Sequence, residues 1–145
     1  MTIKVIALDL EGTLISNAMS QIPRLGLLAF LEACHYLVER VVMFTTVKET
    51  VFRPIATLLV EEGYAPGWFI DIEYIDRDGE TKNLACISGC KPDEALLVDD
   101  FEIYVHPGQE TQWIRIPYFD SPYSDDDNGL EVAMKMIQEK VVKTQ

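Results

Sequence analysis

The amino-acid sequence predicts an α/β domain in which helices flank a mostly parallel sheet. Short apolar runs, typical of buried strands, alternate along the chain with segments whose apolar residues recur at helical spacing. Three of these runs end in acidic or hydroxyl residues, as strands do where their carboxyl ends meet at a ligand-binding edge. The chain has 145 residues, 48% of them hydrophobic, so we expect residues 1–145 to form a single domain.

The order of the expected elements follows from these patterns. Pro23 suits the first position of the first helix, and Gly63 suits the end of the second. Residues 69–75 alternate polar and apolar before Asp78-Gly79, which predicts a small β-hairpin with a return strand near Thr81. The expected strands otherwise cover residues 3–8, 41–44, 95–98, 103–105 and 113–116, and the expected helices cover residues 27–38, 51–59 and 130–141.

The formal net charge of −12 argues against binding to nucleic acid or to an anionic membrane. No apolar run approaches the length of about 18 residues that a membrane span needs. Asp9 and Glu11 interrupt the first apolar run, which therefore does not resemble a signal peptide. The odd number of cysteines, three, favours reduced thiols, and we expect a cytoplasmic protein.

Two side-chain clusters have alternative interpretations. Cys86 and Cys90 could hold a metal ion, but no third cysteine or clustered histidine completes the site, so buried thiols are the simpler interpretation. The acidic run 125–127 could bind a cation, or could be a solvated loop whose negative charge suits the start of the following helix.

Pairs of polar residues follow three of the expected strands. In order along the chain they are Asp9 and Glu11, Thr45 and Thr46, and Asp99 and Asp100. Because the carboxyl ends of parallel strands lie at one edge, these residues should converge there. Clustered carboxylates suit Mg²⁺, a hard cation that prefers oxygen ligands, and a hydroxyl suits a phosphoryl oxygen. One carboxylate could then act as a nucleophile and the other as a proton shuttle.

A phosphoryl site of this kind also needs a compact positive charge, which Lys82 or Lys91 could supply. Lys91 comes shortly before the strand at 95–98 and should lie near its amino end, away from the site. The interval between Lys82 and the strand at 95–98 leaves room for a turn and a return strand, so the spacing favours Lys82 as the lysine of the site. Lys91-Pro92 remains the alternative.

The motifs are similar to those of the haloacid-dehalogenase (HAD) superfamily of aspartate-nucleophile phosphatases. Asp9-Leu10-Glu11-Gly12-Thr13 resembles the first motif, Asp-x-Asp-x-Thr, with Glu11 as the one departure. Phe44-Thr45 resembles the second motif, and Asp99-Asp100 resembles the fourth. Within the superfamily the chain is most similar to the small-CTD-phosphatase (FCP/NIF-like) branch. That similarity rests on Val42-Met43-Phe44-Thr45-Thr46, on Lys82-Asn83-Leu84, on the hairpin before Lys82, and on Pro23-Arg24-Leu25 to Phe30-Leu31.

The resemblance implies a HAD-like Rossmannoid fold and Mg²⁺-dependent phosphoester hydrolysis. The spacing between the motifs leaves little room for a large cap domain, so none is expected. The resemblance also implies that Asp9 forms an aspartyl-phosphate and that Glu11 transfers protons. Mg²⁺ would be held by Asp9, the Glu11 backbone carbonyl and Asp100, with Asp99 assisting. The phosphoryl oxygens would be bound by Thr45, Thr46 and Lys82. The substrate would be a phosphoprotein or a small phosphoester.

Other functions remain open from the residues alone. Glu11 could merely satisfy backbone groups at a strand end, although it has an intrinsic pKa similar to that of aspartate and could perform the same proton transfer. The chain could also be a binding or regulatory module that retains metal and phosphate but turns over poorly. A receiver domain of the response-regulator kind also combines paired acids, threonine and lysine, but the Gly-Thr pair and the hairpin do not suit it.

Overall fold

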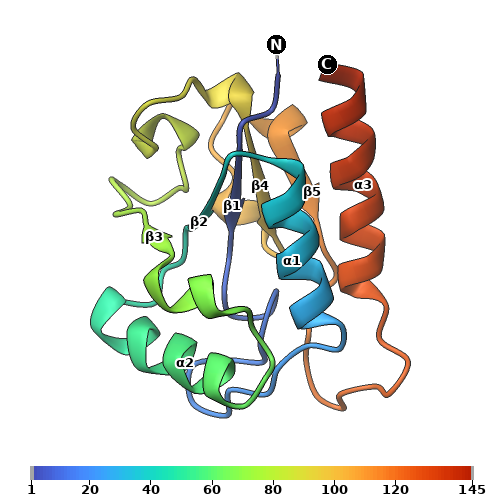
Figure 1. The fold of residues 1–145 in the computed structure, drawn as a ribbon. Coiled ribbons are helices and arrows are strands. Elements are labelled where there is room, and N and C mark those ends of the chain that lie inside the picture. The colour runs from blue at the N-terminus through green and yellow to red at the C-terminus, as the bar shows by residue number, and fades with distance from the viewer. Residues whose placement is uncertain (1, 145) are drawn as a thin grey trace.

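A five-stranded sheet forms the centre of the computed structural model, which describes residues 2–144 (Figure 1). The strand order is β3-β2-β1-β4-β5, and every pairing between neighbouring strands is parallel. The predicted α/β class and HAD-like Rossmannoid architecture are therefore confirmed. The strands are β1 (Val5–Leu8), β2 (Arg40–Met43), β3 (Glu73–Tyr74), β4 (Ala95–Asp99) and β5 (Trp113–Arg115).

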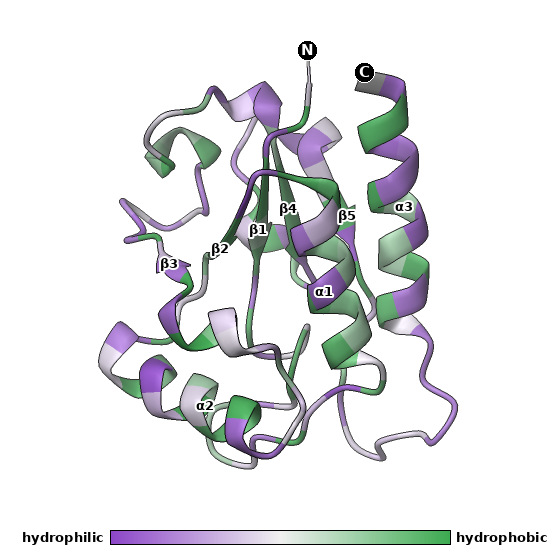
Figure 2. Cartoon of the chain, viewed as in Figure 1, coloured by the Kyte–Doolittle hydropathy of each residue, from purple (hydrophilic) through white to green (hydrophobic). Residues whose placement is uncertain are grey.

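Strand β1 lies between β2 and β4 and is buried on both faces, which explains its unbroken apolar run. Figure 2 shows β1 and β4 as continuously hydrophobic ribbons at the centre of the molecule. Leu8, the last residue of β1, lies opposite Met43 and Val98. The residues that follow these three positions therefore emerge side by side at the carboxyl edge of the sheet.

The two faces of the sheet are covered differently. Helices α1 (Leu27–Leu37), α2 (Glu49–Glu61) and α3 (Gly129–Thr144) contribute to the larger hydrophobic core, which also contains Ile6 and Leu8. Figure 1 shows α1 and α3 side by side, and α2 near the carboxyl edge. On the other face, Val5 and Ala7 pack in a smaller core with Leu84 and Ile87, which lie in the irregular segment before β4.

The predicted hairpin before Lys82 is wrong. Strand β3 pairs in parallel with β2, and residues 75–81 form a loop. Near Thr81 the chain makes only an isolated parallel bridge between Lys82 and Val105. Gly79 does adopt the left-handed turn conformation, with φ of 91°. Of the alternating residues 69–75, residues 69–71 belong to a 3₁₀ helix, and only Glu73–Tyr74 form a strand, whose partner is β2.

Two local predictions are also wrong. Pro23 does not open α1: it pairs with Ile15 in an antiparallel bridge, and the helix starts at Leu27 after Gly26, whose φ is 83°. Residues 102–104 form a 3₁₀ turn in place of the expected strand over 103–105. Within residues 2–144 no helix is long and apolar enough to cross a bilayer.

Candidate active site

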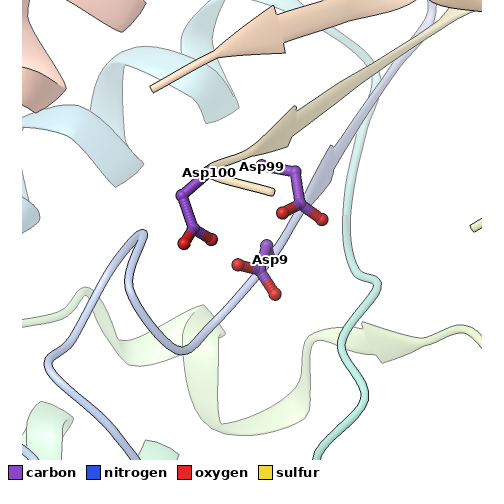
Figure 3. Close-up of side chains that lie close together, drawn as sticks. All are labelled: Asp9, Asp99 and Asp100. Atoms are coloured by element: carbon purple, nitrogen blue, oxygen red, sulfur yellow. The ribbon is translucent and has the colours of Figure 1, made fainter. Parts of the chain in front are cut away.

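Three aspartates meet at the carboxyl edge of the sheet. Asp9 follows β1, Asp99 ends β4, and Asp100 comes next (Figure 3). One carboxylate oxygen from each lies within 4.8 Å of the others. The parallel pairing of β1 with β4 produces this convergence, because it places Asp9 beside the end of β4 and its amide donates to the Val98 carbonyl at 3.0 Å.

Lys82 is the positive charge of this cluster. Its side chain is buried, with the residue only 1% exposed, and its Nζ lies 2.8 Å from Asp9 Oδ1 and also donates to Asp99 Oδ2. The backbone places it through a hydrogen bond from its amide to the Tyr104 carbonyl at 2.7 Å. Burial alone would lower the pKa of Lys82, but attraction to Asp9 and Asp99 outweighs burial and raises the pKa above its ordinary value.

Lys91, the alternative lysine, is exposed and lies outside this cluster. It precedes the 3₁₀ turn Pro92–Glu94, which leads into the amino end of β4. Parallel strands place that end opposite the edge that carries the aspartates. The structure thus brings Lys82 to the three carboxylates and leaves Lys91 at the other end of the strand.

Asp99 is fully buried and both of its carboxylate oxygens have partners. Oδ2 accepts from Lys82, and Oδ1 accepts from the Phe101 amide at 2.9 Å. Burial and repulsion from Asp9 raise the pKa of Asp99 to about 6, while Lys82 and the Phe101 amide act in the opposite direction. Asp99 is therefore tied to the lysine. Unlike Asp9 and Asp100 it does not line the cavity, so it is less available to a cation than its two neighbours.

Asp100 is half-buried and faces a cavity that also reaches Asp9. Burial, a hydrogen bond with Asp9 and repulsion from Asp9 and Asp99 raise the pKa of Asp100 to about 8. A divalent cation at this point would relieve the repulsion. The donor set of hard carboxylate oxygens fits Mg²⁺, so the residues present match the implied metal.

Thr13 was quoted in the sequence motif without a role, and the structure gives it a contact with both of the carboxylates that face the cavity. Its buried hydroxyl lies 2.8 Å from Asp9 Oδ2 and 3.2 Å from Asp100 Oδ1. Lys82 and Thr13 thus contact different oxygens of Asp9 and fix the orientation of its carboxylate. The motif spacing was the only sequence signal for this position.

Gly12 is required by close packing beside the aspartates. It has a φ of 73°, and an added Cβ would lie 2.5 Å from the Tyr118 ring and 2.7 Å from Asp100 Oδ2. Its carbonyl accepts a hydrogen bond from the Phe119 amide at 2.9 Å. The segment after β5 therefore packs directly on the loop after Asp9.

Arg24 is a second buried cation that sequence reasoning missed as a site-supporting residue. It is 2% exposed, and its Nη1 donates to the carbonyls of Gly12 and Thr13 at 3.4 and 3.3 Å. Its guanidinium also makes a bidentate ion pair with Asp127, at 2.7 and 3.0 Å. The expectation that the acidic run 125–127 is only a solvated loop is therefore wrong for Asp127, which anchors the segment before α3 to the loop after Asp9.

Glu11 and Thr46 line the cavity, whereas Thr45 does not. The Glu11 carboxylate accepts a hydrogen bond from the Ala18 amide at 2.7 Å. Thr45 is buried, and its hydroxyl accepts from the Val47 amide at 3.1 Å, which leaves Thr46 as the exposed hydroxyl after β2. Of the two predicted threonines, the structure brings Thr46 to the cavity.

The cavity has a volume of about 620 Å³ and is open to solvent. Asp9 and Asp100 lie at its base, and its walls come from the loops after four different strands. The size suits a small phosphoester or one side chain of a larger substrate. The wall residues are Glu11, Ser16, Asn17, Thr46, Phe101, Glu102, Tyr104, Arg115 and Tyr118.

Comparison with known proteins agrees with this geometry. A search of curated proteins finds no match. The family model of the NLI interacting factor-like phosphatases matches residues 4–145, which is nearly the whole chain. These are HAD-like phosphatases, a class that acts on phosphorylated substrates and generally uses a divalent metal. The match agrees with the aspartate cluster and with the parallel sheet. The chain therefore belongs to the NLI interacting factor-like phosphatase family.

Proposed function

We propose that the protein hydrolyses a phosphomonoester in a Mg²⁺-dependent reaction through an aspartyl-phosphate on Asp9. The observation that carries this proposal is the position of Asp9 at the base of the open cavity. One of its carboxylate oxygens contacts Lys82 and the other contacts Thr13. A carboxylate held in this way is oriented for attack, and its charge remains balanced by the lysine.

The Mg²⁺ ion would be held by the side chains of Asp9 and Asp100 and by the backbone carbonyl of Glu11. When bound, it would offset the negative charge of the carboxylates and the phosphoryl oxygens. Asp99 supports the site from behind, because it is fully buried outside the cavity lining and pairs with Lys82 and the Phe101 amide.

In the first step, an Asp9 oxygen attacks phosphorus while the bond from phosphorus to the leaving oxygen breaks. Glu11 donates a proton to that oxygen and becomes a carboxylate. Thr46 contacts the phosphoryl oxygens, and Lys82 balances the charge on Asp9 from behind it. In the second step, Glu11 takes a proton from water as the water oxygen attacks phosphorus. The bond from phosphorus to Asp9 then breaks, inorganic phosphate leaves, and both side chains return to their starting states.

Hydrolysis of p-nitrophenyl phosphate tests this function. The wild-type protein should release nitrophenol with millimolar Mg²⁺, should stop when the metal is chelated, and should recover when Mg²⁺ is restored. Wild-type protein that is folded and loaded with Mg²⁺ but releases no phosphate from any phosphomonoester would contradict the proposal.

A second candidate is a regulatory module that binds Mg²⁺ and phosphate but turns over poorly. The observation that favours it is the hydrogen bond from the Ala18 amide to the Glu11 carboxylate, which gives Glu11 a structural role without catalysis. This candidate predicts that inorganic phosphate with Mg²⁺ raises the melting temperature while no substrate is hydrolysed. Measurable turnover that depends on Glu11 would exclude it.

A further inference from the structure

Among residues 2–144, Arg115 is the single cationic side chain that lines the cavity. The other charged residues of the lining are Asp9, Glu11, Glu102 and Asp100, all acidic. Lys82 lies behind Asp9, is almost fully buried, and already pairs with two aspartates. A second anionic group on a substrate would therefore find a cationic partner on the cavity wall at Arg115.

The fold holds Arg115 in place beside the aspartates. It is the last residue of β5 and lies opposite Asp99 in the strand register. Its guanidinium lies over the Trp113 ring, 5.4 Å from the ring centroid, and the Trp113 indole N–H donates to the Asp99 carbonyl at 2.9 Å. Stacking on an indole restricts the guanidinium while leaving its N–H donors available.

Arg115 also lacks a carboxylate partner in a very acidic protein. Arg24, Arg40 and Arg53 each pair with an aspartate or glutamate, whereas Arg115 forms no ion pair with any residue in the described range 2–144. The formal net charge is −12, so negative side chains are abundant on this chain. An unpaired guanidinium beside a phosphoryl site is suited to a ligand carboxylate, which it can bind with two parallel hydrogen bonds.

Two exposed aromatic side chains also line the cavity. Phe101 is 54% exposed and follows β4, while Tyr118 is 62% exposed and follows β5. Tyr118 packs on Gly12, at the entrance to the aspartates. These rings offer an apolar surface to a substrate whose phosphoryl group lies at Asp9 and whose leaving group reaches Arg115.

We infer that Arg115 binds a second anionic group, a carboxylate, on the leaving group of the phosphomonoester. This inference rests on the proposed function and specifies its substrate class. The long-range field of the protein repels an anionic substrate, so a local cation on the wall is needed to select one. An acidic side chain next to a phosphorylated residue and a small phosphoester with a carboxylate offer the same chemistry.

The test compares phenyl phosphate with 4-carboxyphenyl phosphate, which adds one carboxylate to the same leaving group. Arg115→Gln should lower kcat/KM for 4-carboxyphenyl phosphate by about tenfold, mainly through KM, because the lost pair is a charged hydrogen-bonded contact. The same variant should leave phenyl phosphate within about twofold of wild type. Arg115→Lys should restore part of the preference. Arg53→Gln, the control that removes an arginine outside the cavity, should leave kcat/KM for both substrates unchanged.

The outcomes separate the inference from the proposed function. Equal effects of Arg115→Gln on both members of a pair, or no effect on either, in this pair and in the two pairs described next would overturn the inference. Hydrolysis of phenyl phosphate by the wild type would still uphold the function. Wild-type protein that hydrolyses neither substrate would overturn both.

Two further substrate pairs identify the source of the carboxylate. One compares phosphoserine peptides that carry a neighbouring Glu or a neighbouring Gln. The other compares free phosphoserine with its carboxamide. Selectivity in either pair that depends on Arg115 supports the inference. Absence of such selectivity in all three pairs contradicts it.

Discussion

The base and the rim of the cavity differ in burial and in how their charged side chains are paired. The base, defined as Asp9 and the two residues behind it, Lys82 and Asp99, is buried, and Lys82 partly offsets the charge of the two aspartates through direct contacts. The rim, defined as Glu11, Thr46, Phe101, Arg115 and Tyr118, is open to solvent, and its side chains are free to meet a ligand.

This difference separates substitutions that should unfold the protein from those that should only change its chemistry. A buried charge that loses its partner carries the full cost of desolvation, whereas an exposed charge regains water. We therefore expect loss of the buried lysine to affect stability and activity together, and rim substitutions to affect activity alone.

Replacement of Lys82, at the base of the cavity, should have the largest effect. Lys82→Met leaves Asp9 and Asp99 buried without a counter-charge, which should lower the free energy of unfolding by about 3–5 kcal/mol and abolish hydrolysis. Lys91→Met, at an exposed position, should change the free energy of unfolding by less than about 0.5 kcal/mol. Urea unfolding of both variants measures the contrast. Similar losses in the two variants would show that the base is no more sensitive than the surface.

Asp9→Asn, also at the base of the cavity, should change kcat without lowering the melting temperature. It removes the proposed nucleophile, so kcat for p-nitrophenyl phosphate should fall by about 10³-fold or more. The melting temperature should hold or rise, because the change also removes the repulsion that Asp9 exerts on Asp99 and Asp100. Turnover close to that of the wild type would identify a different nucleophile.

Glu11→Gln tests the role of the rim carboxylate. Glutamine can still accept the Ala18 amide hydrogen bond but cannot transfer a proton, so kcat for an alkyl phosphate should fall by about 10²-fold. The loss should be smaller for p-nitrophenyl phosphate, whose leaving group needs little protonation. Equal rates in the variant and the wild type for both substrates would show that Glu11 has no role beyond its hydrogen bond with the Ala18 amide.

Gly129→Ala probes the second buried ion pair, between Arg24 and Asp127. An added Cβ would lie 2.1 Å from Arg24 Nη2, so the guanidinium must move, and we expect a loss of about 1–3 kcal/mol in the free energy of unfolding. Gly67→Ala is the matched control, because nothing lies within 4 Å of its added Cβ. Chemical denaturation of both variants gives the comparison, and an unchanged Gly129→Ala would show that Arg24 moves freely.

The smallest effect should be the pH dependence of stabilisation by Mg²⁺. The pKa of Asp100 is raised to about 8, so the metal-free folded protein keeps a proton that the unfolded chain loses above about pH 4. Stability without metal should therefore fall as pH rises from about 4 to about 8. Because the cation replaces this proton, the gain in melting temperature with Mg²⁺ should increase from about pH 6 to about pH 8. Asp100→Asn should remove this increase, and a gain independent of pH would contradict the prediction.

Sequence reasoning located the strands around the site because a buried parallel strand has an unbroken apolar run. It failed for residues 69–81, since an alternating segment looks the same whether it pairs with its own return strand or, as β3 does, with β2. It also missed the ion pair between Arg24 and Asp127, which joins positions 103 residues apart. No local pattern reports a contact over that separation.

The sequence by itself determined the parallel α/β framework and the set of acids and hydroxyls at its carboxyl edge, because periodicity and strand ends are local properties of the chain. Only the tertiary structure decided that Lys82 pairs with Asp9 and Asp99, that Thr46 rather than Thr45 lines the cavity, and that Arg115 lies on its wall without a carboxylate partner. Burial and pairing depend on which distant segments the fold brings together, and these decide where each charge can act.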